Sequence, residues 1–253
     1  MFVSIVIMPR FLLTSMLGSE LFKGGTAMDD VNQLMNDREK DFPNALLEAR
    51  TILLERIVQD DSDAVGLATL AQVEYWLGTH TNDSGEKEAY LADGVEYGKQ
   101  AAQRAPDSVE ANFWYVNCMA AHGMVRGMMN SLFYLKPMEK FGKKALELDE
   151  TYFAAAPLRM MGRYYFKVPA WPVGSGDKPK GIELLERAVE VAPDYLYNAV
   201  CLADAYLATD RKEEARALLQ KVLDAPEPEG FKLSHTKFQG EARELMEKLS
   251  VTE

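Results

Sequence analysis

Cysteine and basic charge are scarce in this chain of 253 residues. Two cysteines, Cys118 and Cys201, are too few for a disulfide-stapled scaffold. Acidic residues number 39 against 28 lysines and arginines, which gives a net charge of −11. Nucleic-acid binding normally uses a basic surplus, so we expect no nucleic-acid partner. No charge-free apolar run reaches about 20 residues, so we also expect no membrane span. The apolar content of 47% excludes a disordered chain and predicts a folded one.

Recognisable catalytic or metal-binding patterns are also missing. The only histidines are His80, His122 and His235, and no cysteine or carboxylate pair completes a metal set around them. The Gly-x-Gly sequence before Asp177 follows no predicted strand, so it reads as a turn in which Asp177 caps the next helix. No sequence motif indicates a nucleophilic side chain with a base positioned to activate it. We therefore expect no metal, no cofactor and no enzymatic activity.

The first 27 residues form an apolar segment that we treat separately from the fold. Gly25 and Ala27 suit the end of a short export signal, whose start would normally be basic. The segment could equally precede a true start at Met28, or form an additional helix. Export predicts a periplasmic protein, and a start at Met28 predicts a cytoplasmic one. Residues 28–253 are predicted to form one domain.

Three segments of the chain end alike, which indicates an internal repeat. They read KQAAQRAPD (99–107), GKKALELDE (142–150) and LERAVEVAPD (185–194). Each has an alanine followed five residues later by proline or glutamate. Seven residues before these alanines lie Gly94, Met138 and Gly181. Small side chains at fixed spacing let two helices approach closely, so this pattern predicts repeated helix pairs.

This pattern resembles the tetratricopeptide repeat (TPR), a helix–turn–helix unit with small residues at repeat positions 8, 20 and 27. Ala203, Ala215 and Val222 fit these positions without a gap. Three earlier units carry an insertion after their first helix. The resemblance implies an all-α, right-handed solenoid of antiparallel helix pairs, with end-capping helices at 44–59 and 235–249. The units are predicted at 63–108, 109–152, 153–194 and 195–228.

The segment from 164 to 207 resembles particular subfamilies of TPR proteins. It carries a Gly-Asp-rich link before the helix that contains LLERAVEV. It looks like the T-component (TatT-like) proteins of bacterial TRAP transporters and their relatives, although no cysteine for a lipid anchor follows the N-terminal segment. Some eukaryotic microtubule-associated TPR proteins have a similar link. In the T-component proteins, insertions help to close a ligand-holding cavity. One insertion here, MVRGMMNSLFYLKP (124–137), is Met-rich, which suits either an adaptable binding surface or ordinary core.

In TPR solenoids the first helix of each unit lines the concave face, and repeat positions 5, 9 and 12 supply most of the lining. Arg159 and Arg163 lie four residues apart and so share a helix face. Guanidinium groups offer forked donors that suit a carboxylate. The predicted groove residues are Gln72, Tyr75, Trp76, Phe113, Asn117, Arg159, Arg163, Phe166 and Asp204.

Part of this set is similar to the carboxylate clamp of chaperone-binding TPR domains. Asn117, Arg159 and Arg163 match that pattern, whereas Ala68 and Gln72 depart from it. The arginines could instead bond acidic surfaces of neighbouring helices. The first hypothesis is a non-enzymatic scaffold that binds a protein or peptide, with or without a carboxylate, in its groove. The alternative is a TatT-like accessory protein that encloses a small, partly apolar anion. An open groove favours the first, and an enclosed aromatic pore favours the second.

Overall fold

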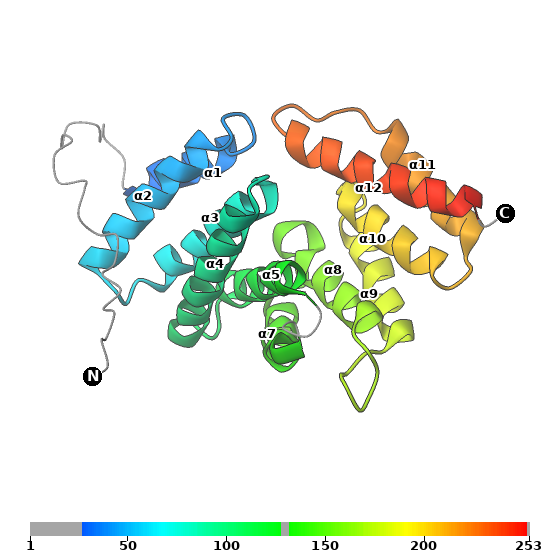
Figure 1. Ribbon diagram of the computed structural model, residues 1–253, viewed down its shortest axis with the longest axis horizontal. Helices are drawn as coiled ribbons and strands as arrows, with labels where there is room; N and C mark the ends of the chain where they lie inside the picture. Colours follow the sequence, from blue (N-terminus) through cyan, green and yellow to red (C-terminus); the bar gives the residue numbers. More distant parts are fainter. Residues whose placement is uncertain (1–26, 128–131, 252–253) are drawn as a thin grey trace, which may run out of the picture.

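The computed structural model describes residues 27–127 and 132–251, and within these ranges the chain forms only helices and the turns between them. Figure 1 shows the helices stacked side by side along a curved path, with the two ends of the stack turned toward each other. The all-α solenoid prediction is confirmed. The predictions about residues 1–26, and those about 128–131 of the Met-rich insertion, lie outside the described residues.

Successive antiparallel helix pairs build the stack. The pairs are α3 (Ala64–His80) with α4 (Ser84–Arg104), α5 (Val109–Arg126) with α7 (Leu135–Leu148), α8 (Tyr152–Lys167) with α9 (Lys178–Val191), and α10 (Leu196–Leu207) with α11 (Lys212–Asp224). A 3-10 turn, η1 (Leu132–Tyr134), precedes α7. Helices α1 (Ala27–Asp37) and α2 (Asn44–Gln59) flank one end, and α12 (Lys232–Val251) flanks the other. Helix α1 is a helix that the repeat pattern does not predict.

Small residues bring the paired helices into contact, as the repeat spacing predicts. A Cβ atom placed on Gly181 of α9 would lie 2.8 Å from the carbonyl oxygen of Gly162 in α8. In the first pair, a Cβ atom on Gly94 would lie 3.2 Å from Glu74 Cβ in α3. The paired helices therefore approach closely where the sequence supplies glycine, and at Gly162 and Gly181 their backbones touch.

The insertions differ in form from pair to pair. In the first pair the extra residues lengthen α3 and α4, and only residues 81–83 link them. In the third pair they form a loop, 168–177, that ends in the cap of α9. There the Asp177 carboxylate accepts a hydrogen bond from the backbone nitrogen of Lys180 at 3.2 Å, so the predicted cap is present.

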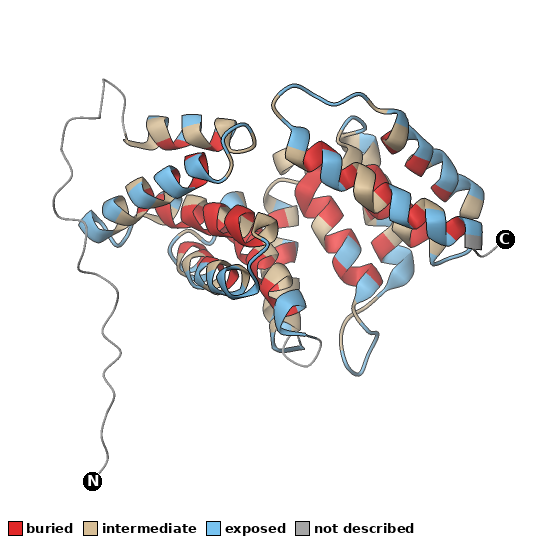
Figure 2. Ribbon diagram, turned by 45° about the horizontal axis from the view of Figure 1, so that its top comes forward, coloured by how far each residue is buried: buried red, intermediate tan, exposed pale blue. Residues whose placement is uncertain are grey.

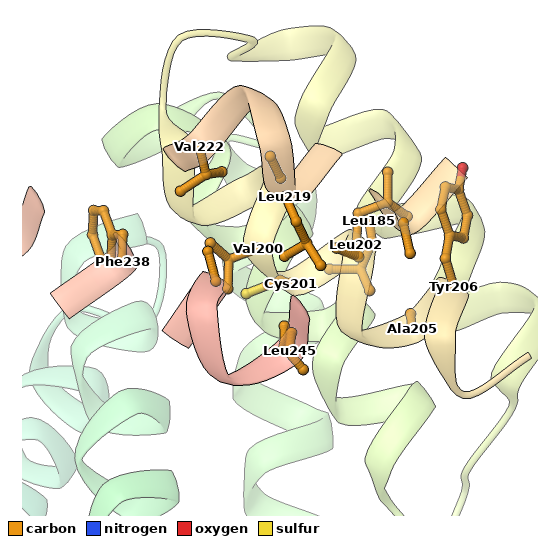
Figure 3. Close-up of a cluster of buried hydrophobic side chains, with 14 of the residues drawn as sticks. Leu185, Val200, Cys201, Leu202, Ala205, Tyr206, Leu219, Val222, Phe238 and Leu245 are labelled. Atoms are coloured by element: carbon orange, nitrogen blue, oxygen red, sulfur yellow. The ribbon is translucent and has the colours of Figure 1, made fainter. Parts of the chain in front are cut away.

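The core is distributed along the stack, as expected for a solenoid in which each unit packs on its neighbours. Figure 2 shows buried residues on the inner faces of the helices and exposed residues on α11, α12 and the 168–177 loop. In Figure 3, the side chains of α10 pack against those of α9, α11 and α12. Cys201 lies in this cluster and Cys118 in another, and both are free and buried.

Within the described residues, no helix combines the length and the apolar character that crossing a bilayer requires. Those residues also contain no group of three or more His, Cys, Asp and Glu side chains able to hold a metal ion.

A buried carboxylate in α3 makes the stability of this end of the stack depend on pH. Glu74 is 0% exposed; its Oε1 accepts from Arg50 Nε at 2.6 Å, while Oε2 has no partner among the described residues. Burial raises the pKa of Glu74 from 4.5 to about 7, against the opposing effect of Arg50. The folded chain therefore binds more protons than the unfolded chain between these values, and stability falls as the pH rises through that window.

We expect Glu74→Gln to remove this dependence. Between pH 4.5 and 7, the free energy of unfolding of the unmodified chain should fall by up to about 3 kcal/mol relative to Glu74→Gln. Chemical denaturation at several pH values measures the difference. Glu96→Gln, which alters an exposed carboxylate, is the matched control and should track the unmodified chain. Parallel pH profiles for Glu74→Gln and the unmodified chain would contradict the prediction.

Candidate functional site

An inner cavity of about 90 Å³ lies on the concave side of the stack. Six of the predicted groove residues line it, namely Tyr75, Trp76, Phe113, Asn117, Arg159 and Arg163. The remaining wall comes from the end of α3, from Trp114 of α5, from α8, from the link before α10 with the first turn of that helix, and from the start of α12. An outer vestibule of about 630 Å³ adjoins the inner cavity and shares Trp76, Phe153, Tyr195, Ser234 and Phe238 with it.

Contact between the two ends of the stack closes this space on one side. The backbone nitrogen of Ser234, in α12, donates to Glu39 Oε2 at 3.0 Å, and the Ser234 hydroxyl donates to Glu39 Oε1 at 2.5 Å. Glu39 lies in the turn between α1 and α2, which Figure 1 places beside the link that leads into α12. The concave face is therefore a pocket with a mouth, not a groove that is open along its whole length.

Three cations face the inner cavity. Arg159 is 7% exposed, whereas Arg163 and Lys237 are solvent-accessible within the concave wall. None of the three takes part in an ion pair with another described residue. Burial lowers the pKa of Lys237; the charge of Glu241, one turn further along α12, opposes this shift, and the charge of Arg163 adds to it. Among the residues that the structure describes, the lining of the inner cavity contains these three cations and no Asp or Glu, so the cavity favours an anion.

Hydrogen bonds and rings hold the arginines in place. Arg159 Nη1 donates to Asn198 Oδ1 at 2.5 Å and to the Ala154 carbonyl at 3.2 Å, and its guanidinium lies 4.8 Å from the centre of the Tyr195 ring. Arg163 Nη1 donates to the Tyr197 hydroxyl at 2.9 Å. These partners are neutral, so both positive charges remain uncompensated by acidic neighbours within hydrogen-bond reach. Neither arginine forms an ion pair with a described acidic residue of a neighbouring helix, although the charge of Glu241 in α12 acts on Arg163.

A short left-handed segment shapes the same wall. Phe153, Ala154 and Ala155 have φ values of 46°, 57° and 60°, which side chains with a Cβ adopt at a cost of about 1–2 kcal/mol each. The segment turns Phe153 toward both cavities and presents the Ala154 carbonyl to Arg159 and Asn198. Strained backbone of this kind persists only where surrounding contacts hold it, and it often lies at binding sites.

Aromatic side chains form most of the remaining surface. Tyr197 stacks on Phe238 of α12 with ring centres 4.8 Å apart, and Phe113, Trp114 and Phe153 form edge-to-face or tilted contacts. Burial raises the pKa of Tyr75 to about 12, so its hydroxyl remains protonated at neutral pH. Trp76 Nε1 is buried without a partner among the described residues. The site thus combines apolar walls, hydrogen-bond donors and positive charge.

Three of the predicted groove residues lie elsewhere. Phe166 is 6% exposed and packs into the core with Leu185 of α9, because the last turn of α8 runs beside the Gly162–Gly181 contact. Asp204 forms an ion pair with Lys167 at 2.5 Å and does not line the cavity. Gln72 also lies outside the lining. Asn117 does line it, but its Nδ2 donates to the Phe113 carbonyl and to Met160 Sδ, so this amide is not directed at a ligand.

Eleven of the seventeen described residues that line the inner cavity are not among the predicted groove residues. Among them, Phe153 comes from the left-handed turn, Tyr195 from the link before α10, Tyr197 from the first turn of α10, and Lys237 and Phe238 from the terminal helix. The TPR spacing assigns groove positions only to the first helix of each unit. The aromatic cluster around the link before α10, DYLYN (194–198), is the one sequence signal that could have pointed to it.

The fold and the stacked pairs define a TPR-type helical repeat protein. A tetratricopeptide repeat model matches residues 173–228. A family model described as regulator of microtubule dynamics protein 1-3 matches residues 27–173, more than half of the chain. The chain therefore belongs to the regulator of microtubule dynamics family. The T-component resemblance is not supported, whereas the noted likeness to microtubule-associated TPR proteins agrees with this family.

Individual relatives agree with this assignment. Regulator of microtubule dynamics protein 1 of Pongo abelii is 25% identical over 155 residues, which cover 56% of this chain and 49% of that protein. The Bos taurus protein of the same name is 25% identical over 184 residues, covering 66% and 57%. The chain thus spans about half the length of the curated relatives it matches. These relatives are mammalian, so they do not support a bacterial origin.

A solved structure supports the fold independently. The crystal structure of a thermophilic TPR protein from Thermus thermophilus covers 84% of this chain and 98% of its own, with a TM-score of 0.60. The sequence identity is 18%, so this similarity bears on the fold alone.

Proposed function

We propose that this chain is a non-enzymatic binding module that holds the carboxylate end of an apolar segment of a protein partner in its concave pocket. The observation that carries the proposal is the set of three cations, Arg159, Arg163 and Lys237, in the lining of an aromatic-walled cavity whose described lining residues include no Asp or Glu. Forked guanidinium donors beside apolar walls suit a carboxylate attached to an apolar body.

The dimensions of the two cavities favour insertion of a chain end. The inner cavity of about 90 Å³ suits a carboxylate or a similar small group, and the vestibule of about 630 Å³ suits the residues that precede it. The contact between Ser234 and Glu39 interrupts the concave face, so a long peptide lying along the whole groove is disfavoured.

A free small anion is the second candidate. The same closure favours it, because an enclosed aromatic pore with Arg163 in its wall was the feature expected for a small, partly apolar ligand. This candidate shares only the kind of ligand, a small and partly apolar anion, with the T-component proteins. No role in TRAP transport is proposed. The two candidates share the pocket and differ in whether the anion belongs to a protein.

The names of the relatives suggest where a protein partner acts. They are called regulators of microtubule dynamics. We propose that the partner of this chain belongs to the microtubule system. Co-sedimentation with microtubules tests whether the partner belongs to the microtubule system. Loss of co-sedimentation in Arg163→Ala would show that this binding uses the pocket.

We expect Arg163→Ala to weaken anion binding about 30-fold with little loss of stability, because the side chain is accessible and makes one neutral hydrogen bond. Anilinonaphthalene sulfonate, which joins an aromatic body to an anion, is the fluorescent probe. Peptides with an apolar C-terminal residue, carrying a free or amidated carboxyl group, then compete with the probe. The free acid should displace it and the amide should not.

Arg187→Ala is the matched control, because Arg187 is an exposed arginine of α9 whose partners are Glu150 and Glu190. It should bind the probe as the unmodified chain does. Displacement by small carboxylates but by no peptide would favour the free anion. Equal probe affinity in Arg163→Ala and Arg187→Ala would refute the pocket assignment.

A further inference from the structure

Two insertions meet on a surface outside the pocket. We call the combined residues 132–144 and 167–180 the insertion edge. The Tyr164 hydroxyl, at the end of α8, donates to the carbonyl of Leu135 at 3.0 Å. The Ser175 hydroxyl donates to Glu139 Oε2 at 2.7 Å. These bonds hold the 168–177 loop against the start of α7, and Figure 1 shows both at the lower border of the molecule.

Large apolar side chains at this edge point into solvent. Trp171 is 87% exposed, Phe133 is 82% exposed and Val173 is 58% exposed. The other tryptophans, Trp76 and Trp114, are 9% and 2% exposed. The exposed groups lie on a loop tip and a short 3-10 turn rather than along a groove. Such projecting tips suit insertion into a soft apolar phase better than packing against a rigid partner surface.

The edge is basic in an acidic chain. It contains seven lysines and two acidic residues, a net charge of +5 against −11 for the whole chain. Two of these lysines, Lys144 and Lys167, form ion pairs with Asp107 and Asp204 outside the edge. Lys136, Lys140, Lys178 and Lys180 are exposed and take part in no ion pair with a described residue. Lysine stems can lie along apolar surface while their ammonium groups remain in water.

We propose that the insertion edge docks on a membrane surface that contains anionic lipids. Tryptophan and phenylalanine favour the bilayer interface, and each nearby lysine adds attraction to an anionic leaflet. The acidic remainder of the chain is repelled by the same surface, so the charge distribution selects one orientation. No residue of the edge lines either cavity, so docking leaves the pocket mouth accessible.

Vesicle sedimentation tests the proposal with two compositions, phosphatidylcholine alone and phosphatidylcholine mixed with phosphatidylserine. We expect binding to the mixed vesicles and its loss at high salt. Lys136→Gln with Lys140→Gln should lower partitioning about 25-fold, about fivefold for each lysine. Trp171→Ala should lower it about 10-fold, because the ring no longer enters the interface. The matched control, Lys99→Gln with Lys232→Gln, alters exposed lysines outside the edge and should bind as the unmodified chain does.

Tryptophan fluorescence reports insertion directly, because Trp171 alone among the tryptophans is exposed. Mixed vesicles should shift the emission to the blue. Trp171→Phe should keep most of the partitioning and lose the shift. Thermal unfolding by circular dichroism checks that each variant remains folded.

Several outcomes would overturn the proposal. They are absence of binding to mixed vesicles, binding unaffected by the edge variants, and an unshifted emission in the bound state. Loss of binding to polyglutamate in the lysine variants, without any vesicle binding, would replace the membrane with an acidic protein as the occupant of the edge.

Discussion

Gly181→Ala should destabilise the chain by about 3 kcal/mol, although alanine is the better helix former. The added Cβ would lie 2.8 Å from the Gly162 carbonyl oxygen and 2.8 Å from the backbone nitrogen of Phe166. Both neighbours are backbone atoms of α8, so relief requires α8 and α9 to move apart. Because α8 carries Arg159 and Arg163, we also expect weaker binding of anilinonaphthalene sulfonate. Chemical denaturation measures the loss of stability.

Gly240→Ala is the matched control, since a Cβ on that glycine of α12 would meet no atom within 4 Å. There alanine should stabilise the chain by up to about 1 kcal/mol through its helix propensity. If both substitutions were stabilising, close contact between the backbones of α8 and α9 would be ruled out.

The Gly162–Gly181 contact also shows which part of the fold the sequence predicts. Small residues at repeat spacing predict which helices pair and where they touch, because two helices can approach closely only where their facing side chains are small. The form of an insertion is less predictable. In the first unit the extra residues continue two helices, and in the third they form a loop, although spacing alone describes both in the same way. The third insertion contains two prolines, Pro169 and Pro172, and two glycines, which disfavour helix.

The left-handed turn at 153–155 is unpredictable for a different reason. Phe-Ala-Ala before a helix reads as ordinary right-handed helix, since a Cβ atom disfavours the left-handed region. Only tertiary contacts, including the hydrogen bonds from Arg159 and Asn198 to Ala154, hold it there. Local sequence contains no sign of these contacts.

The pocket is predictable to the extent that it depends on the repeat. Tyr75, Phe113, Arg159 and Arg163 were assigned from helix positions and line one cavity. The wall from α12 depends on the contact of Ser234 with Glu39, which are 195 residues apart in the chain. No repeat period relates such positions. The two ends meet because the stack is curved, and this curvature results from small rotations added up over all the units.

Asn198→Ala should cost about 4 kcal/mol, the largest loss that we expect from a single polar side chain that supports the pocket wall from behind. Asn198 is 1% exposed. Its Nδ2 lies within hydrogen-bond distance of the carbonyls of Ala154, Ala188 and Ala192, at 3.3, 3.0 and 3.1 Å. Alanine would leave buried acceptors unpaired and remove the shortest hydrogen bond of Arg159.

Asn198→Asp separates the two functions of this side chain. An ionised aspartate still accepts from Arg159 but cannot donate to the three carbonyls. If donation to the carbonyls dominates, Asn198→Asp should lose most of the stability that Asn198→Ala loses, and the left-handed turn should relax. Asn44→Ala, which removes an exposed hydrogen bond to Asp41, should cost less than about 1 kcal/mol. Full stability in Asn198→Asp would show that the contact with Arg159 alone holds this wall, and that the carbonyls of the turn need no donor from α10.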